Sequence, residues 1–126
     1  MAFSMTERID WHFLGSRLRA IDFHFLWMVA APESEWLWSY IGVDGGDVLF
    51  TGNSTRVEFA YAAKLVWGSK QFAPVRDCDR AHVASQARRV GQIFNSLERE
   101  GFATRNQSKG RKCDTTLRLP IRGGAK

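Results

Sequence analysis

The chain has 126 residues, of which 44% are hydrophobic and 13% aromatic, and its formal net charge is +5 at pH 7. This length predicts a single domain with room for an apolar core. The sequence has no run of 18 apolar residues and no signal-peptide pattern at its N-terminus, so we expect no transmembrane helix and no signal peptide. Two cysteines far apart in the sequence, Cys78 and Cys113, favour a cytoplasmic protein with free thiols.

The charge is divided unevenly along the chain. Residues 1–52 hold three basic and seven acidic residues, a net charge of −4, whereas residues 53–126 hold fifteen basic and six acidic residues, a net charge of +9. Concentrated positive charge is typical of a domain that binds a polyanion such as nucleic acid. A mildly basic charge without such a partner is the alternative interpretation.

A short sequence recurs within the first thirty residues. IDWHFL at residues 9–14 returns as IDFHFL at residues 21–26. The apolar spacing of the second copy, which continues into an apolar run, predicts a helix that Ser16 caps and that extends to about Ala31, with Pro32 ending it. Each copy also alternates between apolar and polar residues, so a β-hairpin over the two copies is the competing prediction.

The two copies share an Asp-x-His pair, which is Asp10 with His12 and then Asp22 with His24. In a hairpin, residues two apart share one face of their strand, so the four side chains could converge on a metal ion. On helices they would diverge and would be surface or hydrogen-bonded residues. We favour the helix for the second copy, and we expect no metal site and no cofactor.

A β-hairpin is predicted from residue 35 to residue 51. The aromatic stretch EWLWSYIGV at 35–43 leads into the turn sequence DGGD at 44–47, and VLFT at 48–51 follows as the second strand. The pattern Thr55-x-x-Glu58 is then a capping box, which predicts a helix to about residue 67. The apolar side of this helix is expected to hold Phe59, Ala62, Ala63 and Val66.

The last third of the chain predicts a helix followed by two strands. Apolar residues at spacings of three and four define one face of the helix, formed by Val83, Ala87, Val90, Phe94 and Leu97. Gly101 follows Glu100 at the place where a left-handed C-terminal cap is needed. Residues 102–106 and 115–119 have strand patterns, and the polar stretch 107–114 between them predicts an exposed turn.

The start of this helix has two interpretations. Ser85 could cap a separate helix, preceded by a short one that Asp79 caps, with a turn at residues 84–86. That stretch has neither glycine nor proline. One continuous helix over residues 79–100 is therefore the alternative, and it would weaken a helix-turn-helix interpretation.

The predicted order of elements is a helix, a glycine cap, a strand, a basic loop and a returning strand. This order resembles the C-terminal half of winged helix-turn-helix proteins, especially regulators of the MarR type. In that family the run V-x-x-[LI]-[LF]-x-x-L-E-x-x-G-[LF] joins the recognition helix to the wing. The chain has Val90, Ile93, Phe94, Leu97, Glu98, Gly101 and Phe102 at these positions. The resemblance covers the last third of the chain well and the middle third loosely.

No long linker or low-complexity tract divides the chain, so we expect one domain with an α+β fold over residues 1–126. The winged helix-turn-helix part would be residues 53–122, followed by a tail at 123–126. Residues 1–52 would be an acidic, aromatic-rich extension made of a helix and a β-hairpin.

The function implied by the resemblance is a DNA-binding protein that regulates transcription. With the apolar face of the helix inward, five polar residues would face the DNA: Gln86, Arg88, Arg89, Gln92 and Asn95. Arginine can pair with guanine, and glutamine or asparagine with adenine, in the major groove of double-stranded DNA. The wing would add three basic residues at phosphates or in the minor groove, namely Lys109, Arg111 and Lys112.

The N-terminal half is richer in large aromatic residues than a small core needs, with Trp11, Trp27, Trp36, Trp38 and Tyr40. Tryptophan and tyrosine are favoured at the centres of interfaces. Part of this set would pack the core, and part could form a homodimer that places two recognition helices on DNA. The alternative function is a non-enzymatic protein-interaction module, such as a phage or plasmid accessory protein that docks on a larger nucleic-acid-binding complex.

No enzymatic activity is expected. The sequence lacks a phosphate-binding glycine loop, a nucleophile elbow and a zinc-deaminase signature. Asp44 and Asp47 could suggest a nuclease, but they flank two glycines, where aspartate commonly serves the turn. Cys78 and His82 are four residues apart and could share a helix face, yet two cysteines without a second close pair are a weak metal pattern.

Overall fold

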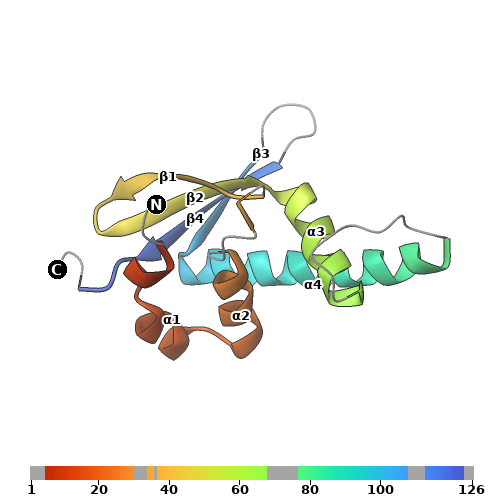
Figure 1. The fold of residues 1–126 in the computed structure, drawn as a ribbon, viewed down its shortest axis with the longest axis horizontal. Coiled ribbons are helices and arrows are strands. Elements are labelled where there is room, and N and C mark those ends of the chain that lie inside the picture. Colours follow the sequence, from red (N-terminus) through yellow and green to blue (C-terminus); the bar gives the residue numbers. More distant parts are fainter. Residues whose placement is uncertain (1–4, 30–33, 36, 68–76, 108–112, 124–126) are drawn as a thin grey trace.

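The structure, a computed structural model, has an α+β fold in which helices pack against one antiparallel sheet (Figure 1). It describes residues 5–29, 34–35, 37–67, 77–107 and 113–123. The described elements are, in chain order, the 3-10 helix η1 (Met5–Arg8), α1 (Trp11–Arg17), α2 (Ala20–Val29), β1 (Ser39–Asp44), β2 (Asp47–Asn53), α3 (Ser54–Trp67), α4 (Asp77–Glu100), β3 (Ala103–Gln107) and β4 (Cys113–Pro120). The predicted α+β class is confirmed.

Four strands form the sheet in the order β1-β2-β4-β3, and each neighbouring pair is antiparallel. Helices α1, α2 and α4 lie on one side of this sheet (Figure 1). Alternate residues of β2 and β4 are buried in the core cluster, namely Val48, Phe50, Leu117 and Leu119. The core therefore lies between one face of the sheet and the helices that cover it.

The predicted hairpin is confirmed as β1 and β2, although β1 begins at Ser39 rather than at residue 35 and β2 extends to Asn53. Gly45 and Gly46 occupy its two-residue turn with φ of 60° and 93°, a conformation that tight hairpins need and glycine adopts without strain. Arg118 of β4 donates hydrogen bonds to the Asp44 and Asp47 carboxylates at 3.1 and 3.2 Å. These two aspartates thus link the hairpin turn to the neighbouring strand β4.

The N-terminal repeat forms two short helices, so the competing hairpin prediction is wrong. The predicted start of the second helix at Ser16 is also wrong, because Ser16 lies inside α1 and its hydroxyl donates to the Phe13 carbonyl. Leu18 adopts an extended conformation and separates the two helices. The described part of α2 runs from Ala20 to Val29, and the predicted end at residue 31 lies outside the described residues.

The two aspartates of the repeat have different structural roles. Asp10 caps α1 by accepting a hydrogen bond from the Phe13 backbone N–H at 3.0 Å. Asp22 is fully buried and accepts hydrogen bonds from Arg19 and from the Ser96 hydroxyl of α4. Within the described part of the chain, no group of three or more His, Cys, Asp or Glu residues is placed to hold a metal ion.

Helix α3 differs from its prediction at its start and on one face. Asn53, rather than the Thr55 capping box, closes the first turn, because its side chain accepts the Arg56 backbone N–H at 3.0 Å. Ala62 and Ala63 are buried as predicted, but Phe59 is 39% exposed. Val57 and Tyr61 face the core instead, since residues four apart share one helix face. The Val66 side chain lies outside the described part of the structure.

Helix α4 is continuous from Asp77 to Glu100, so the interpretation with a turn at residues 84–86 is wrong. This outcome weakens the helix-turn-helix interpretation of residues 79–100, because the predicted turn before the recognition helix is absent. Neither glycine nor proline interrupts that stretch, and the apolar face remains in phase from Val83 to Leu97. Gly101 ends the helix with φ of 89°, as predicted, while the Phe102 N–H bonds to the Leu97 carbonyl at 2.9 Å. The chain then turns directly into β3.

Phe25 of α2 lies where the main elements of the core meet. Its ring makes edge-to-face contacts with Trp38, Tyr61 and Phe94, at centroid distances of 6.4, 5.1 and 5.4 Å. These partners belong to the segment before β1, to α3 and to α4. One buried ring therefore connects three separate parts of the chain to α2.

We expect Phe25→Ala to lower the free energy of unfolding by about 3–5 kcal/mol, because it removes a buried ring and leaves a cavity. Urea denaturation would measure the change. Phe59→Ala deletes the same side chain at a partly exposed position and should cost about 1 kcal/mol or less. Equal losses in the two variants would contradict the central position assigned to Phe25.

Candidate functional site

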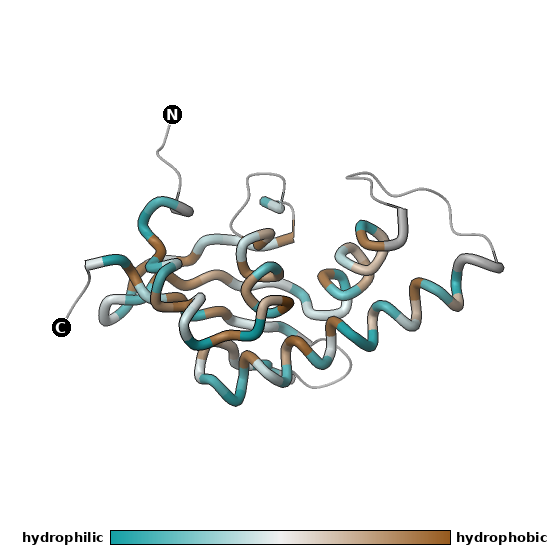
Figure 2. The backbone as a smooth tube through the Cα atoms, turned by 90° about the horizontal axis from the view of Figure 1, so that it is seen from below, coloured by the Kyte–Doolittle hydropathy of each residue, from teal (hydrophilic) through white to brown (hydrophobic). Residues whose placement is uncertain are grey.

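The exposed side of α4 presents one line of polar residues. Val90, Phe94 and Leu97 point into the core, which leaves positions on the opposite side of the helix in solvent. The exposed residues recur at spacings of four, three and four and form one line, which we call the outer stripe: Arg88, Gln92, Asn95 and Arg99. Figure 2 shows hydrophilic and hydrophobic residues alternating along α4, as expected for an amphipathic helix.

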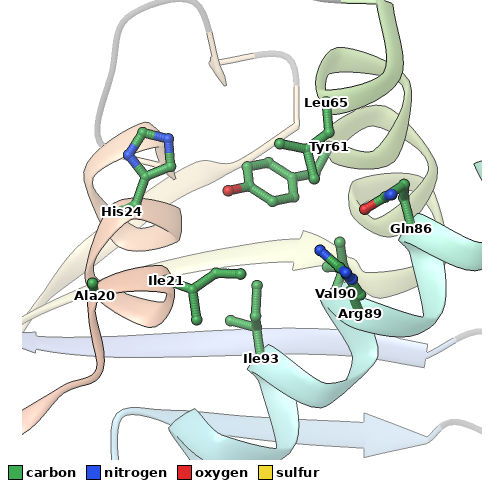
Figure 3. A pocket seen from close by; sticks show the side chains of 9 residues that line it. All are labelled: Ala20, Ile21, His24, Tyr61, Leu65, Gln86, Arg89, Val90 and Ile93. Atoms are coloured by element: carbon green, nitrogen blue, oxygen red, sulfur yellow. The ribbon is translucent and has the colours of Figure 1, made fainter.

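The structure separates the predicted DNA-binding residues into three groups. Arg88, Gln92 and Asn95 belong to the outer stripe. Gln86 and Arg89 lie to one side of it and line a hollow between α2, α3 and α4 (Figure 3). The third group is the predicted wing, and it lies outside the described residues: Lys109, Arg111 and Lys112. Adjacent positions on a helix differ by about 100°, which explains why Arg88 and Arg89 diverge.

Arg99 belongs to the outer stripe but was missed by the sequence-based prediction. It follows Asn95 by four positions and Arg88 by eleven, so helical periodicity alone could have identified it. The arginines at 88, 89 and 99 make no ion pair or hydrogen bond with any residue in the described part of the chain. These three arginines have no partner among the described residues and are available to an anionic ligand.

Asn95 is engaged with the protein itself. The Arg105 guanidinium of β3 donates hydrogen bonds to the Asn95 side-chain oxygen and to Glu98, the latter at 3.3 Å. It also lies over the Phe94 ring, with 5.7 Å between the guanidinium carbon and the ring centroid. Bidentate pairing with adenine needs both the oxygen and the amide N–H of asparagine. Asn95 therefore anchors the stripe to the sheet and is a poor candidate for base recognition in this arrangement.

The hollow beside the outer stripe has a volume of about 540 Å³. Its walls come from α2, α3 and α4, and its lining residues are Ala20, Ile21, His24, Tyr61, Leu65, Gln86, Arg89, Val90 and Ile93 (Figure 3). Burial raises the pKa of the Tyr61 hydroxyl above its ordinary value, so this phenol is neutral at physiological pH. Sequence reasoning missed this site because its residues come from three helices that are far apart in the chain.

The large aromatic residues of the N-terminal half, predicted to lie partly in the core and partly at an interface, occupy several different places in the described part of the structure. Trp38 is buried in the core, and Trp36 lies outside the described residues. Trp11 and Trp27 form a surface cluster with Phe23, at centroid distances of 4.8 to 6.3 Å. Tyr40 lies on β1, at the edge of the sheet. This strand exposes three apolar side chains, with Tyr40 at 49%, Ile41 at 53% and Val43 at 47%.

No protein-family model, curated protein or solved structure matches the chain. The outer stripe, the hollow and the distribution of charge are the features of the protein that indicate a function. None of the described helices has the length and apolar character needed to cross a membrane.

Glu58 of α3 supplies a titrating group next to α4. Burial raises the pKa of its carboxyl above the ordinary 4.5, and the positive charge of Arg105 opposes this shift only in part. A raised folded-state pKa means that the ionised carboxylate costs stability once the pH exceeds 4.5, the value at which it ionises in the unfolded chain. The loss of folding stability reaches its full size when the pH is above the pKa of Glu58 in the folded protein.

Glu58→Gln should therefore raise the melting temperature at pH 7, because it removes a partly desolvated charge while keeping the shape of the side chain. The gain should disappear below the ordinary pKa of 4.5, where Glu58 is protonated in both the folded and the unfolded protein. Thermal unfolding from pH 3.5 to 8 would test both parts. A variant that is less stable at pH 7 would mean that the attraction to Arg105 outweighs burial.

Proposed function

We propose that the protein binds duplex DNA through the outer stripe of α4, as a winged-helix regulator of transcription. The proposal rests on the exposed line of residues along α4. Arg88 and Arg99 have no partner within the described part of the chain, and Gln92 lies between them. Arginine pairs with guanine or phosphate, and glutamine with adenine, when an α-helix enters the major groove. The concentration of positive charge in residues 53–126 supports the same partner.

The length of the stripe fits this role. Arg99 follows Arg88 by eleven positions, which is about 16 Å along a helix at about 1.5 Å per residue. That length corresponds to about five base-pair steps of about 3.4 Å each. The stripe can therefore contact bases near its middle and phosphates at its ends, which is the division of contacts that positions a recognition helix.

The arrangement of elements after β1 supports the winged-helix interpretation. β2 is followed by α3, α4, β3 and β4, and β4 lies between β2 and β3 in the sheet. Under this proposal α3, rather than a short helix beginning at Asp79, is the helix that precedes the recognition helix, because α4 is continuous. The two are joined by residues 68–76, which lie outside the described residues. The predicted wing at 107–114 would then follow as the connection from β3 to β4.

The combined change Arg88→Ala and Arg99→Ala should weaken binding to random-sequence duplex DNA. If both arginines contact phosphates, the slope of log K against log salt should also flatten by about 2, since each lost phosphate contact removes about one unit. Fluorescence anisotropy over a range of salt concentrations would measure both quantities. The proposal fails if the unaltered protein binds no DNA at low salt.

A control that removes one positive charge outside the outer stripe makes this result specific. Arg122 is exposed, follows β4 and does not belong to the outer stripe, and Arg122→Ala removes half of the charge that the double variant removes. It should change the affinity only slightly and leave the salt slope nearly intact. If Arg122→Ala reduces the binding free energy by half as much as the double variant does, net charge rather than the outer stripe attracts the DNA.

A second function is favoured by the exposed strand β1, whose apolar side chains suit docking on a partner protein or on a second copy of the chain. If this strand is such an interface, Ile41→Lys should prevent association, because a charge at the edge of a sheet opposes strand pairing. Sedimentation would detect a homodimer, and affinity capture would detect another partner. Unchanged association in the variant would remove β1 from the interface.

A further inference from the structure

The hollow between α2, α3 and α4 combines apolar walls with a few polar groups. Ile21 and Leu65 form part of its rim and are 41% and 46% exposed, and Val90 and Ile93 form its base on α4. Its volume of about 540 Å³ falls within the range of about 300–1,000 Å³ that is typical of small-molecule sites. The site therefore has both the size and the mixed lining of a ligand pocket.

Four polar side chains around the hollow have no hydrogen-bonding partner among the residues that the structure describes. Gln86, Arg89, Tyr61 and His24 form no side-chain hydrogen bond and no ion pair with any residue that the structure describes. Figure 3 shows Gln86 and Arg89 on the α4 wall, Tyr61 reaching across from α3, and His24 on the α2 wall. Polar groups of three helices thus surround one apolar space without bonding to each other.

The charge of the lining selects the class of ligand. Arg89 is its one permanently charged group, and none of the lining residues is an acid. Guanidinium binds a carboxylate through two parallel N–H groups. The neutral Tyr61 phenol and the Gln86 amide can donate further hydrogen bonds to the same anion. A single cation beside four apolar side chains suits one carboxylate on an apolar body, and it does not suit a polyphosphate or an amine.

We infer that this hollow binds a small organic monocarboxylate whose apolar body packs against the exposed side chains of Ile21 and Leu65, above the buried Val90 and Ile93. Arg89 holds the carboxylate, and Tyr61 donates a hydrogen bond to it. The apolar body covers Ile21 and Leu65, which are otherwise in contact with water. The inference does not depend on DNA binding, since the ligand contacts the flank of α4 and not its outer stripe.

Octanoate, octanamide and octylamine are suitable probes, because they share one apolar chain and differ in the head group. Titration calorimetry on the full chain should show octanoate binding at one site, at least about tenfold more tightly than octanamide, with octylamine not binding. Proton–carbon NMR spectra should show the largest methyl shifts at Ile21, Leu65, Val90 and Ile93. Absence of octanoate binding at about 10 mM, or equal affinity for octanamide, would overturn the inference.

Two matched substitutions test the residue assignment. Arg89→Gln should weaken octanoate binding by about tenfold or more, whereas Arg88→Gln, one position away on the outer stripe, should leave it unchanged. Tyr61→Phe, which removes only the hydroxyl, should weaken it by a smaller factor. Thermal unfolding would verify that each variant is folded. Equal losses from the Arg88 and Arg89 changes, or methyl shifts centred on residues outside the hollow, would place the carboxylate elsewhere.

Discussion

The packing of the Phe25 ring against Trp38, Tyr61 and Phe94 is the contact on which the arrangement of the helices depends. Edge-to-face contacts restrict both the distance and the angle between rings, so they orient elements as well as attract them. Tyr61 takes part in this contact and also lines the hollow. The geometry of the candidate ligand site is therefore a direct consequence of how the aromatic core is packed.

A buried polar contact fixes the same helices in a second way. Asp22 of α2 accepts a hydrogen bond from Ser96 of α4 at 2.8 Å, and Arg19 neutralises its charge from the surface at 3.0 Å. A buried carboxylate without such partners would cost several kcal/mol, so this group defines one relative position of α2 and α4. Aromatic packing and this hydrogen-bonded carboxylate together hold the walls of the hollow in place.

Three faces of helix α4 have different surroundings. One face packs in the core, a second lines the hollow, and the third carries the outer stripe. Arg88 and Arg89 are neighbours in sequence, yet they belong to different surfaces because of the helical rotation between them. The proposed DNA interface and the inferred carboxylate site thus share a rigid element without sharing the residues that bind.

The sequence by itself determined the features that depend on short-range geometry. The Asp44-Gly45-Gly46-Asp47 turn, the glycine cap at Gly101 and the amphipathic character of α4 follow from local backbone preferences and periodicity. The same periodicity correctly placed Arg88 and Gln92 on the exposed side, and it would have identified Arg99. Only the tertiary structure decided which apolar residues are buried, as with Phe59 and Tyr61, and which polar groups meet around the hollow. These outcomes depend on neighbours far away in the sequence, which local patterns do not specify.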